Sequence, residues 1–192
     1  MRALDKAKIE RYIATYKLTE HHAFPSSYIG EIFRSVEEIE VDPTIYEGGT
    51  RAVTDSVYYL LVGSGITKFN NLKAPKHWHY CDGSPQAVCI IDTKKNTFEE
   101  VILGDPILHE EFGKKSGKQI IQALAILPHQ WTCAKLIDQE SFSLMTCIVT
   151  PGFDIRDFRM IEMEEAKKMF PAFQKQISDF LALPSSAVIF NW

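Results

Sequence analysis

The sequence predicts an all-β domain with helices at both ends, and three observations lead to this prediction. Short apolar or alternating runs fill the middle of the chain, and turn-forming residues separate them about every 8–12 positions. Both ends of the chain instead carry apolar residues at helical spacing. The composition, with 45% hydrophobic and 24% charged residues among 192, is that of an ordinary globular protein. These features indicate a β-sandwich or barrel flanked by terminal helices.

The terminal helices are predicted from periodicity and from one proline. Apolar residues over positions 4–16 lie on one face of a helix. Near the other end, residues 163–170 and 173–181 form two helical patterns, and Pro171 separates them because proline cannot continue a helix. We find no internal repeat or linker. The chain is therefore expected to form one domain. This domain has an N-terminal helix over 1–17, a β-barrel over 18–160, and C-terminal helices and a tail over 161–192.

Nine runs are expected to be strands, because each is rich in β-branched or aromatic residues and ends at Gly, Pro, Asp or Asn. They cover residues 28–36, 56–62, 66–72, 77–81, 87–91, 97–103, 120–127, 131–137 and 142–149. The turn formers between positions 42 and 49 predict a loop.

Charge and hydropathy exclude several classes of function. The formal net charge is −4, which disfavours a surface for nucleic acid or an anionic membrane, because both require clustered Lys and Arg. No apolar stretch approaches the ~20 residues that span a bilayer, and the N-terminal residues lack the apolar core of a signal peptide. We therefore expect a cytoplasmic protein that acts on small molecules.

The four cysteines are expected to be free thiols. They show no C-x-x-C pair, and Cys89 and Cys147 lie inside apolar runs. Buried thiols in a reducing compartment explain this pattern better than disulfide bonds do.

Several short motifs resemble those of one family. They are Glu31-x-x-Arg34-Ser35, Ser56-Val57-Tyr58-Tyr59-Leu60-Leu61, Trp78-His79-x-x-x-Gly83-x-Pro85, the pair Pro128 and Trp131, and Thr150-Pro151-Gly152-Phe153-Asp154. In this order and spacing they resemble the cupin-5 branch of the cupin superfamily, over about residues 18–172. The resemblance implies a double-stranded β-helix jelly roll, a pocket at one mouth of the barrel, and commonly a homodimer.

The chain departs from the family where cupins place metal ligands. The branch usually has His-Arg at the positions of Asn70-Asn71 and Asp-Glu at those of Pro75-Lys76. In cupins generally, several histidines and one glutamate hold the metal, so Asn70 and Lys76 replace two good ligands. Lys76 also places a cation where a metal cation would lie. We therefore expect no metal cofactor, with a metal site built from His77, His79 and His129 as the alternative.

Four residues are the candidate catalytic groups. His77 and His79 are two apart, so on a strand their rings point to one face, and His79 matches a family motif position. A histidine exchanges protons near neutral pH, which suits acid–base catalysis. Tyr58 supplies a phenol and Lys76 a cation. The alternatives are a structural histidine at position 79 and a solvated lysine beside Pro75.

Six further residues are candidates for substrate binding. They are Glu31, Asn70, Trp78, Tyr80, His129 and Trp131. Trp78, Tyr80 and Trp131 suit an apolar or planar ligand, although each could equally be barrel core. Simple alternation places Glu31 and Arg34 on opposite faces of one strand, so only one of them is expected to face the pocket. Lys76 is expected to pair with Glu31 or with an anionic substrate.

Together these residues favour a metal-independent enzyme that uses acid–base chemistry in the barrel. Isomerisation, epimerisation, cyclisation and elimination are the reaction classes that proton transfer alone can carry. A small organic ligand held without catalysis is the first alternative. A metal-dependent cupin oxygenase or isomerase is the second.

Overall fold

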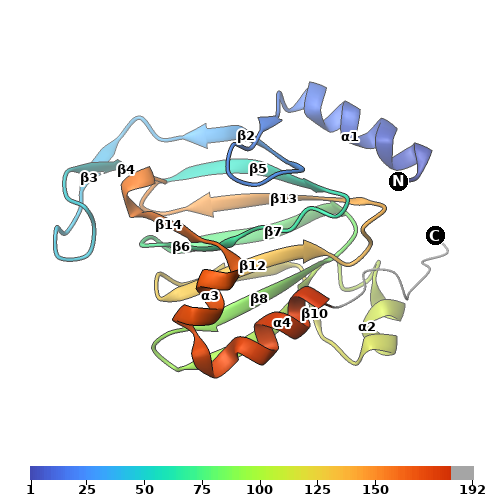
Figure 1. The fold of residues 1–192 in the computed structure, drawn as a ribbon. Helices are drawn as coiled ribbons and strands as arrows, with labels where there is room; N and C mark the ends of the chain where they lie inside the picture. The colour runs from blue at the N-terminus through green and yellow to red at the C-terminus, as the bar shows by residue number, and fades with distance from the viewer. Residues whose placement is uncertain (183–192) are drawn as a thin grey trace.

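The computed structural model describes residues 1–182 and contains two six-stranded sheets that face each other (Figure 1). The first sheet has the order β1 (Thr19–Glu20), β2 (Ser27–Arg34), β5 (Asp55–Val62), β13 (Phe142–Val149), β7 (Lys76–Gly83) and β11 (Ala123–Ile126). The second has the order β10 (Ile120–Ile121), β9 (Thr97–Leu103), β8 (Gln86–Asp92), β12 (Gln130–Leu136), β6 (Phe69–Leu72) and β14 (Phe158–Ile161). The final part of the expected C-terminal tail, 183–192, lies outside the described residues.

The side chains between the two sheets form the inner core of the barrel. Alternation sends every second residue of a strand inward. Tyr59, Trp78 and Met145 of the first sheet meet Val88 and Ala134 of the second in one buried cluster. All these side chains are less than a tenth exposed. The all-β prediction is confirmed.

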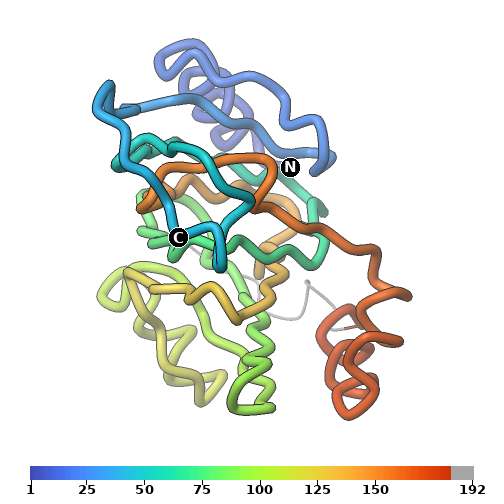
Figure 2. The backbone as a smooth tube through the Cα atoms, turned by 90° about the vertical axis from the view of Figure 1, so that its left-hand side faces the viewer, coloured from blue at the N-terminus to red at the C-terminus, as the bar shows by residue number. Residues whose placement is uncertain are grey.

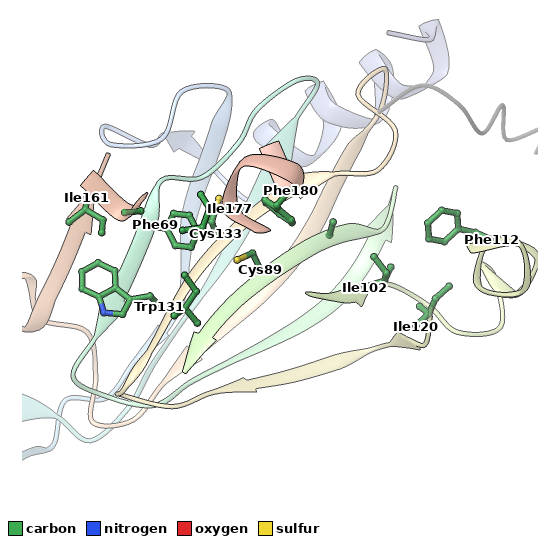
Figure 3. Packing of buried hydrophobic residues seen from close by; sticks show 13 residues of the cluster. Phe69, Cys89, Ile102, Phe112, Ile120, Trp131, Cys133, Ile161, Ile177 and Phe180 are labelled. Carbon is green, nitrogen blue, oxygen red and sulfur yellow. The ribbon is translucent and has the colours of Figure 1, made fainter. Parts of the chain in front are cut away.

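Helices cover the outer faces of both sheets. Helix α1 (Ala3–Thr15) lies over the first sheet, where Ile9 packs with Leu60 and Phe142. Helices α3 (Met163–Met169) and α4 (Gln174–Ala182) cover the second sheet, and Ile177 and Phe180 join the core on that side (Figure 3). Figure 2 shows the same arrangement from the side, with the N-terminal segment and the C-terminal helices at opposite ends. The predicted terminal helices are therefore present.

All nine expected strand runs contain a strand, and one of them is divided. Residues 120–127 form β10, which pairs with β9 in the second sheet, and β11, which pairs with β7 in the first. The chain passes from one sheet to the other between these two strands. Sequence alternation did not reveal helix α2 (Glu110–Ser116), the short strands β1 and β14, or the two-stranded arm of β3 (Glu38–Glu40) and β4 (Thr50–Ala52).

A buried ion pair fixes the arm to the chain that follows β13. Arg51 in β4 is 1% exposed, and its Nε donates to Asp157 Oδ2 at 2.8 Å. Its Nη1 donates to the carbonyl oxygens of Gly48 and Thr50. Asp157 is 2% exposed. The pair therefore joins two segments that are far apart in the sequence, away from solvent.

The four cysteines are free, as the sequence predicted. Cys89 and Cys133 are buried between the second sheet and the C-terminal helices, as Figure 3 shows. Cys81 is exposed. Within residues 1–182, no helix is long and apolar enough to cross a membrane.

Candidate functional site

A cavity of about 530 Å³ lies between the sheets, where β1 and β2 of the first sheet oppose β6 and β14 of the second. Most of its wall is apolar and comes from residues such as Phe24, Ile29, Leu72, Val149 and Phe158. The volume is in the range of sites for small organic molecules. A small, largely apolar guest is therefore the kind of ligand that this cavity can hold.

The first sheet contributes three parallel rows of inward side chains to the cavity. Strand register places Asp55, Val149 and Lys76 in the first row, at the ends of β5, β13 and β7. Val57, Cys147 and Trp78 form the second row. Tyr59 and Met145 form the third. The charged groups thus concentrate in the first row.

A β-bulge in β2 brings two charged residues to the same wall. The pairing of β2 with β5 shifts between Glu31, opposite Val57, and Phe33, opposite Ser56. The extra residue changes the alternation, so both Glu31 and Arg34 line the cavity. The prediction that these two residues face opposite sides of the strand is therefore wrong.

Lys76 is the central polar group of the site. Its side chain is 5% exposed, and its Nζ donates to Asn70 Oδ1 at 2.7 Å and to Thr132 Oγ1 at 3.2 Å. The same Nζ lies 5.1 Å from the centre of the Trp78 ring. An ammonium group has three hydrogens, so two of them have neutral acceptors and one is left for a guest.

The orientation of Asn70 is fixed by the backbone around it. Its Nδ2 donates to the carbonyl oxygens of Lys68 at 3.0 Å and Thr132 at 3.1 Å. Both amide hydrogens are therefore used, and Oδ1 must face the amine of Lys76. The lysine is held by a preformed acceptor instead of by a charged partner.

The positive charge of Lys76 has no carboxylate counterpart nearby. Among residues 1–182, no Asp or Glu oxygen lies within 4.0 Å of its Nζ, so the expected pair with Glu31 is not formed. Burial lowers the pKa of Lys76 to about 8, although the neighbouring Cys147 opposes this shift. The Cys147 thiol has its pKa raised to about 11 by burial. Near neutral pH the cavity therefore contains a protonated thiol and an amine that readily exchanges its proton.

Tyr59 provides a phenol at the other end of the cavity. The residue is 7% exposed, and its hydroxyl oxygen is buried. Burial raises the pKa of Tyr59 well above its ordinary value, so the hydroxyl keeps its proton. The ring of His21 lies beside it, with centroids 6.0 Å apart. Tyr59 therefore contributes a protonated phenol to the cavity wall, whereas sequence analysis had chosen its neighbour Tyr58.

His21 lies beside Tyr59 on the cavity wall. Its Nδ1 accepts a hydrogen bond from the backbone N–H of Ala23 at 3.1 Å. Burial lowers the pKa of His21, so the neutral ring carries its proton on Nε2. Sequence analysis did not choose His21 as a site residue.

The polar end of the cavity is held by an ion pair. Arg34 Nη1 donates to Asp55 Oδ2 at 2.9 Å and to the carbonyl oxygen of Phe153 at 3.3 Å. The backbone N–H of Phe153 donates to the same Asp55 oxygen at 2.8 Å. Burial raises the pKa of Asp55, and the Phe153 N–H and Arg34 oppose that shift. These contacts hold the Phe153 segment against the cavity.

Four of the residues chosen from the sequence meet in this cavity. They are Glu31, Asn70, Lys76 and Trp78. The two histidines of the same strand do not join them. His77 and His79 are exposed on the outer face of β7, because Lys76, Trp78 and Tyr80 take the inward positions. Their expected placement in the pocket is wrong.

The other four chosen residues also lie elsewhere. Tyr58 is on the outer face of β5 and stacks on Tyr16 of α1, with centroids 4.1 Å apart. Trp131 faces the C-terminal helices and contacts Phe170 edge-on. His129 lies beside Asp92, with Nε2 3.2 Å from Oδ2. Tyr80 points inward, but its hydroxyl donates to the Gly83 carbonyl and does not line the cavity.

A metal centre of the kind found in cupins generally does not fit the residues present. The oxygens of Asn70 and Thr132 accept hydrogen bonds from the Lys76 amine, so an ammonium group lies where they converge. The alternative ligands His77, His79 and His129 are not brought together. Within the described part of the chain, no group of three His, Cys, Asp or Glu side chains could hold an ion.

Comparison with known proteins agrees with this architecture. The family model "Cupin superfamily (DUF985)" matches residues 10–161. A hypothetical protein from Leishmania major has a TM-score of 0.70 at 21% identity, covering 88% of this chain and 96% of that one. A protein from Shewanella oneidensis has a TM-score of 0.69 at 20% identity, covering 88% and 94%.

More distant structures share the fold as well. A cupin-2 domain protein from Rhodospirillum rubrum has a TM-score of 0.51 at 11% identity, covering 85% of this chain and 82% of that one. No curated protein matched the sequence. At these identities the structural likenesses establish the fold and nothing about the reaction. They confirm the jelly-roll prediction.

Proposed function

We propose that this chain, which belongs to the DUF985 family of the cupin superfamily, is an enzyme that moves protons on small, mostly apolar carbonyl compounds. The observation that carries the proposal is the Lys76 amine, buried in the cavity wall without a carboxylate partner. Burying an unpaired charge is costly, and such a cost is typical of functional sites. The reaction class is the one expected from the sequence, but Lys76 takes the role expected of His79.

The chemistry follows from Lys76, one of several titratable groups that line the cavity. The neutral amine of Lys76 accepts a proton from the carbon next to the carbonyl group. The ammonium group that forms on Lys76 then stabilises the negative charge that develops on the carbonyl oxygen. The apolar wall strengthens this interaction. Returning the proton to another position completes an isomerisation, and loss of a leaving group completes an elimination.

We expect the protein to accelerate exchange of the α-hydrogens of phenylacetone in D₂O, as followed by proton NMR. Replacing Lys76 with methionine should slow the catalysed exchange by about a hundredfold, since the proton acceptor is lost. In the wild type the rate should rise with pH through about 8, because burial lowers the pKa of Lys76 to that value and the neutral amine is the active form. The matched control is Lys73→Met, which removes a half-buried lysine paired with Glu47 outside the cavity.

Equal exchange in the wild type and the Lys76→Met variant would remove Lys76 from the reaction. A different outcome would favour the alternative function, in which the protein binds a small apolar ligand without catalysis. In that case phenylacetone changes the fluorescence of Trp78, and the wild type gives no exchange above buffer. Comparison with Trp78→Phe assigns the fluorescence signal, because Trp78 lines the cavity and Trp131 does not.

The expected partners follow from this proposal and from the family resemblance. The small organic ligand is the carbonyl compound of the proposed reaction. The homodimer, the cytoplasmic location and the lack of nucleic-acid and membrane binding stay predictions.

A further inference from the structure

We propose that Lys76 forms an imine with apolar aldehydes and ketones that enter the cavity. This inference rests on the proposed function, because the guest is the same class of carbonyl compound. It adds a covalent step in which the amine acts as a nucleophile. The geometry that supports it is an amine on the wall of a cavity of about 530 Å³, held in place by Asn70 and Thr132.

The amine is both oriented and accessible to a guest. Two fixed acceptors position the Nζ, and Lys76 also lines the cavity. Only an unprotonated amine attacks a carbonyl carbon. Since burial lowers the pKa of Lys76 to about 8, about half of the amine is neutral at pH 8. An ordinary lysine with a pKa near 10.5 is less than about 1% neutral at that pH.

The surroundings favour an uncharged carbonyl over a carboxylate as the guest group. A buried carboxylate requires several hydrogen-bond donors, and the amide hydrogens of Asn70 are already used by Lys68 and Thr132. A carbonyl group enters an apolar cavity at much lower cost. The neighbouring Cys147 does not compete strongly as a nucleophile, because burial raises its pKa to about 11 and keeps it as a thiol.

The covalent step balances without an added reactant. The nitrogen lone pair attacks the carbonyl carbon and gives a carbinolamine. The carbon–oxygen bond then breaks, and the oxygen leaves as water with the two hydrogens that the amine had carried. The product is a carbon–nitrogen double bond to Lys76. Once protonated, this bond withdraws electrons from the neighbouring carbon and makes its hydrogen more acidic. In this route Lys76 activates the guest and a water molecule accepts the proton, because the lysine nitrogen is then bonded to the guest.

The test is reductive trapping with cinnamaldehyde and sodium cyanoborohydride on the whole protein at pH 8, followed by peptide mapping with mass spectrometry. Cyanoborohydride converts an imine into a stable secondary amine, so the modified lysine is identified directly. Lys76 should be modified at least tenfold faster than Lys73 and Lys68, which pair with Glu47 and Glu162. Labelling of the Lys76 peptide should disappear in Lys76→Arg and persist unchanged in Lys73→Arg.

The peptide map of the modified wild-type protein decides the inference even if a variant folds poorly. Modification of Lys76 no faster than that of Lys73 would overturn it. If trapping fails while phenylacetone exchange still depends on Lys76, the imine is wrong and the proposed function stands. If trapping succeeds while exchange is absent, Lys76 captures carbonyl compounds and the proposed enzymatic function is wrong.

Discussion

Replacing Lys76 with methionine is expected to raise the free energy of unfolding at pH 7, by up to about 3 kcal/mol. Burial lowers the pKa of Lys76 from its ordinary 10.5 to about 8, and each pH unit of that difference corresponds to about 1.4 kcal/mol. Methionine has a similar shape and no charge, so it removes this cost, and the loss of the hydrogen bond to Asn70 Oδ1 offsets part of the gain. The same change is expected to slow the proposed reaction by about a hundredfold. A residue that destabilises the fold while supporting activity is typical of a functional site.

The stability difference between the wild type and Lys76→Met is expected to depend on pH in a specific direction. Below about pH 8 the folded protein carries the full cost of burying the charged amine. Between about pH 8 and 10.5 the folded state loses its proton before the unfolded state does, so the wild type gains stability relative to the variant. Urea unfolding at a series of pH values measures the difference. Lys73→Met is the control, and a stability advantage for Lys76→Met that does not shrink above pH 8 would contradict the account.

Replacing Asp157 with alanine is expected to lower the free energy of unfolding by about 3–5 kcal/mol. The Arg51 guanidinium is 1% exposed and would keep its charge in the fold without the Asp157 carboxylate at 2.8 Å. The more distant Asp154 oxygen, at 3.6 Å from the Arg51 Nε, compensates in part only. Denaturant unfolding at neutral pH measures the loss.

A matched control separates this effect from the loss of any ion pair. Glu164→Gln breaks the exposed pair with Lys167, in which Nζ and Oε1 are 2.8 Å apart. Solvent screens such surface pairs, so no measurable change in stability is expected. If Asp157→Ala were as harmless as this control, the Arg51 pair would not fix the arm to the barrel.

Most of the fold could be predicted because strands and helices leave strong local patterns. The run 142–149 alternates and is bounded by turn residues, and it forms β13 as expected. The helix predicted over 4–16 forms at Ala3–Thr15. Sequence analysis did not predict the elements that lack a strong periodic pattern. Strand β3 is three exposed residues long, and β14 is paired only through its contact with β6.

The site was predicted in part, because alternation fixes which residues share a face but leaves open which face is inside. On β7 the choice lies between His77 with His79 and Lys76 with Trp78 and Tyr80. The two large aromatic side chains favour the second set, since burying them contributes more than burying imidazoles. Sequence analysis chose members of both sets for the pocket, which alternation along one regular strand does not allow. The structure accommodates the lysine through Asn70 and Thr132, and Thr132 belongs to a distant strand.

The bulge in β2 explains a second difference between sequence and structure. Glu31 and Arg34 are three residues apart, which on a regular strand places them on opposite faces. One extra residue between Glu31 and Phe33 restores them to the same side. Arg34 can then reach Asp55 and the Phe153 carbonyl. No local sequence pattern marks this bulge, because its position depends on pairing with β5.

The titration of the Lys76 amine itself, by NMR of protein with ¹³C-labelled lysine side chains, tests the central claim most directly. Lys76→Arg assigns the signal. The structure predicts a midpoint near pH 8 and a change in that signal when phenylacetone is added. A midpoint near the ordinary value of 10.5, with no response to phenylacetone, would show that Lys76 is a solvated side chain and that the site must be sought elsewhere.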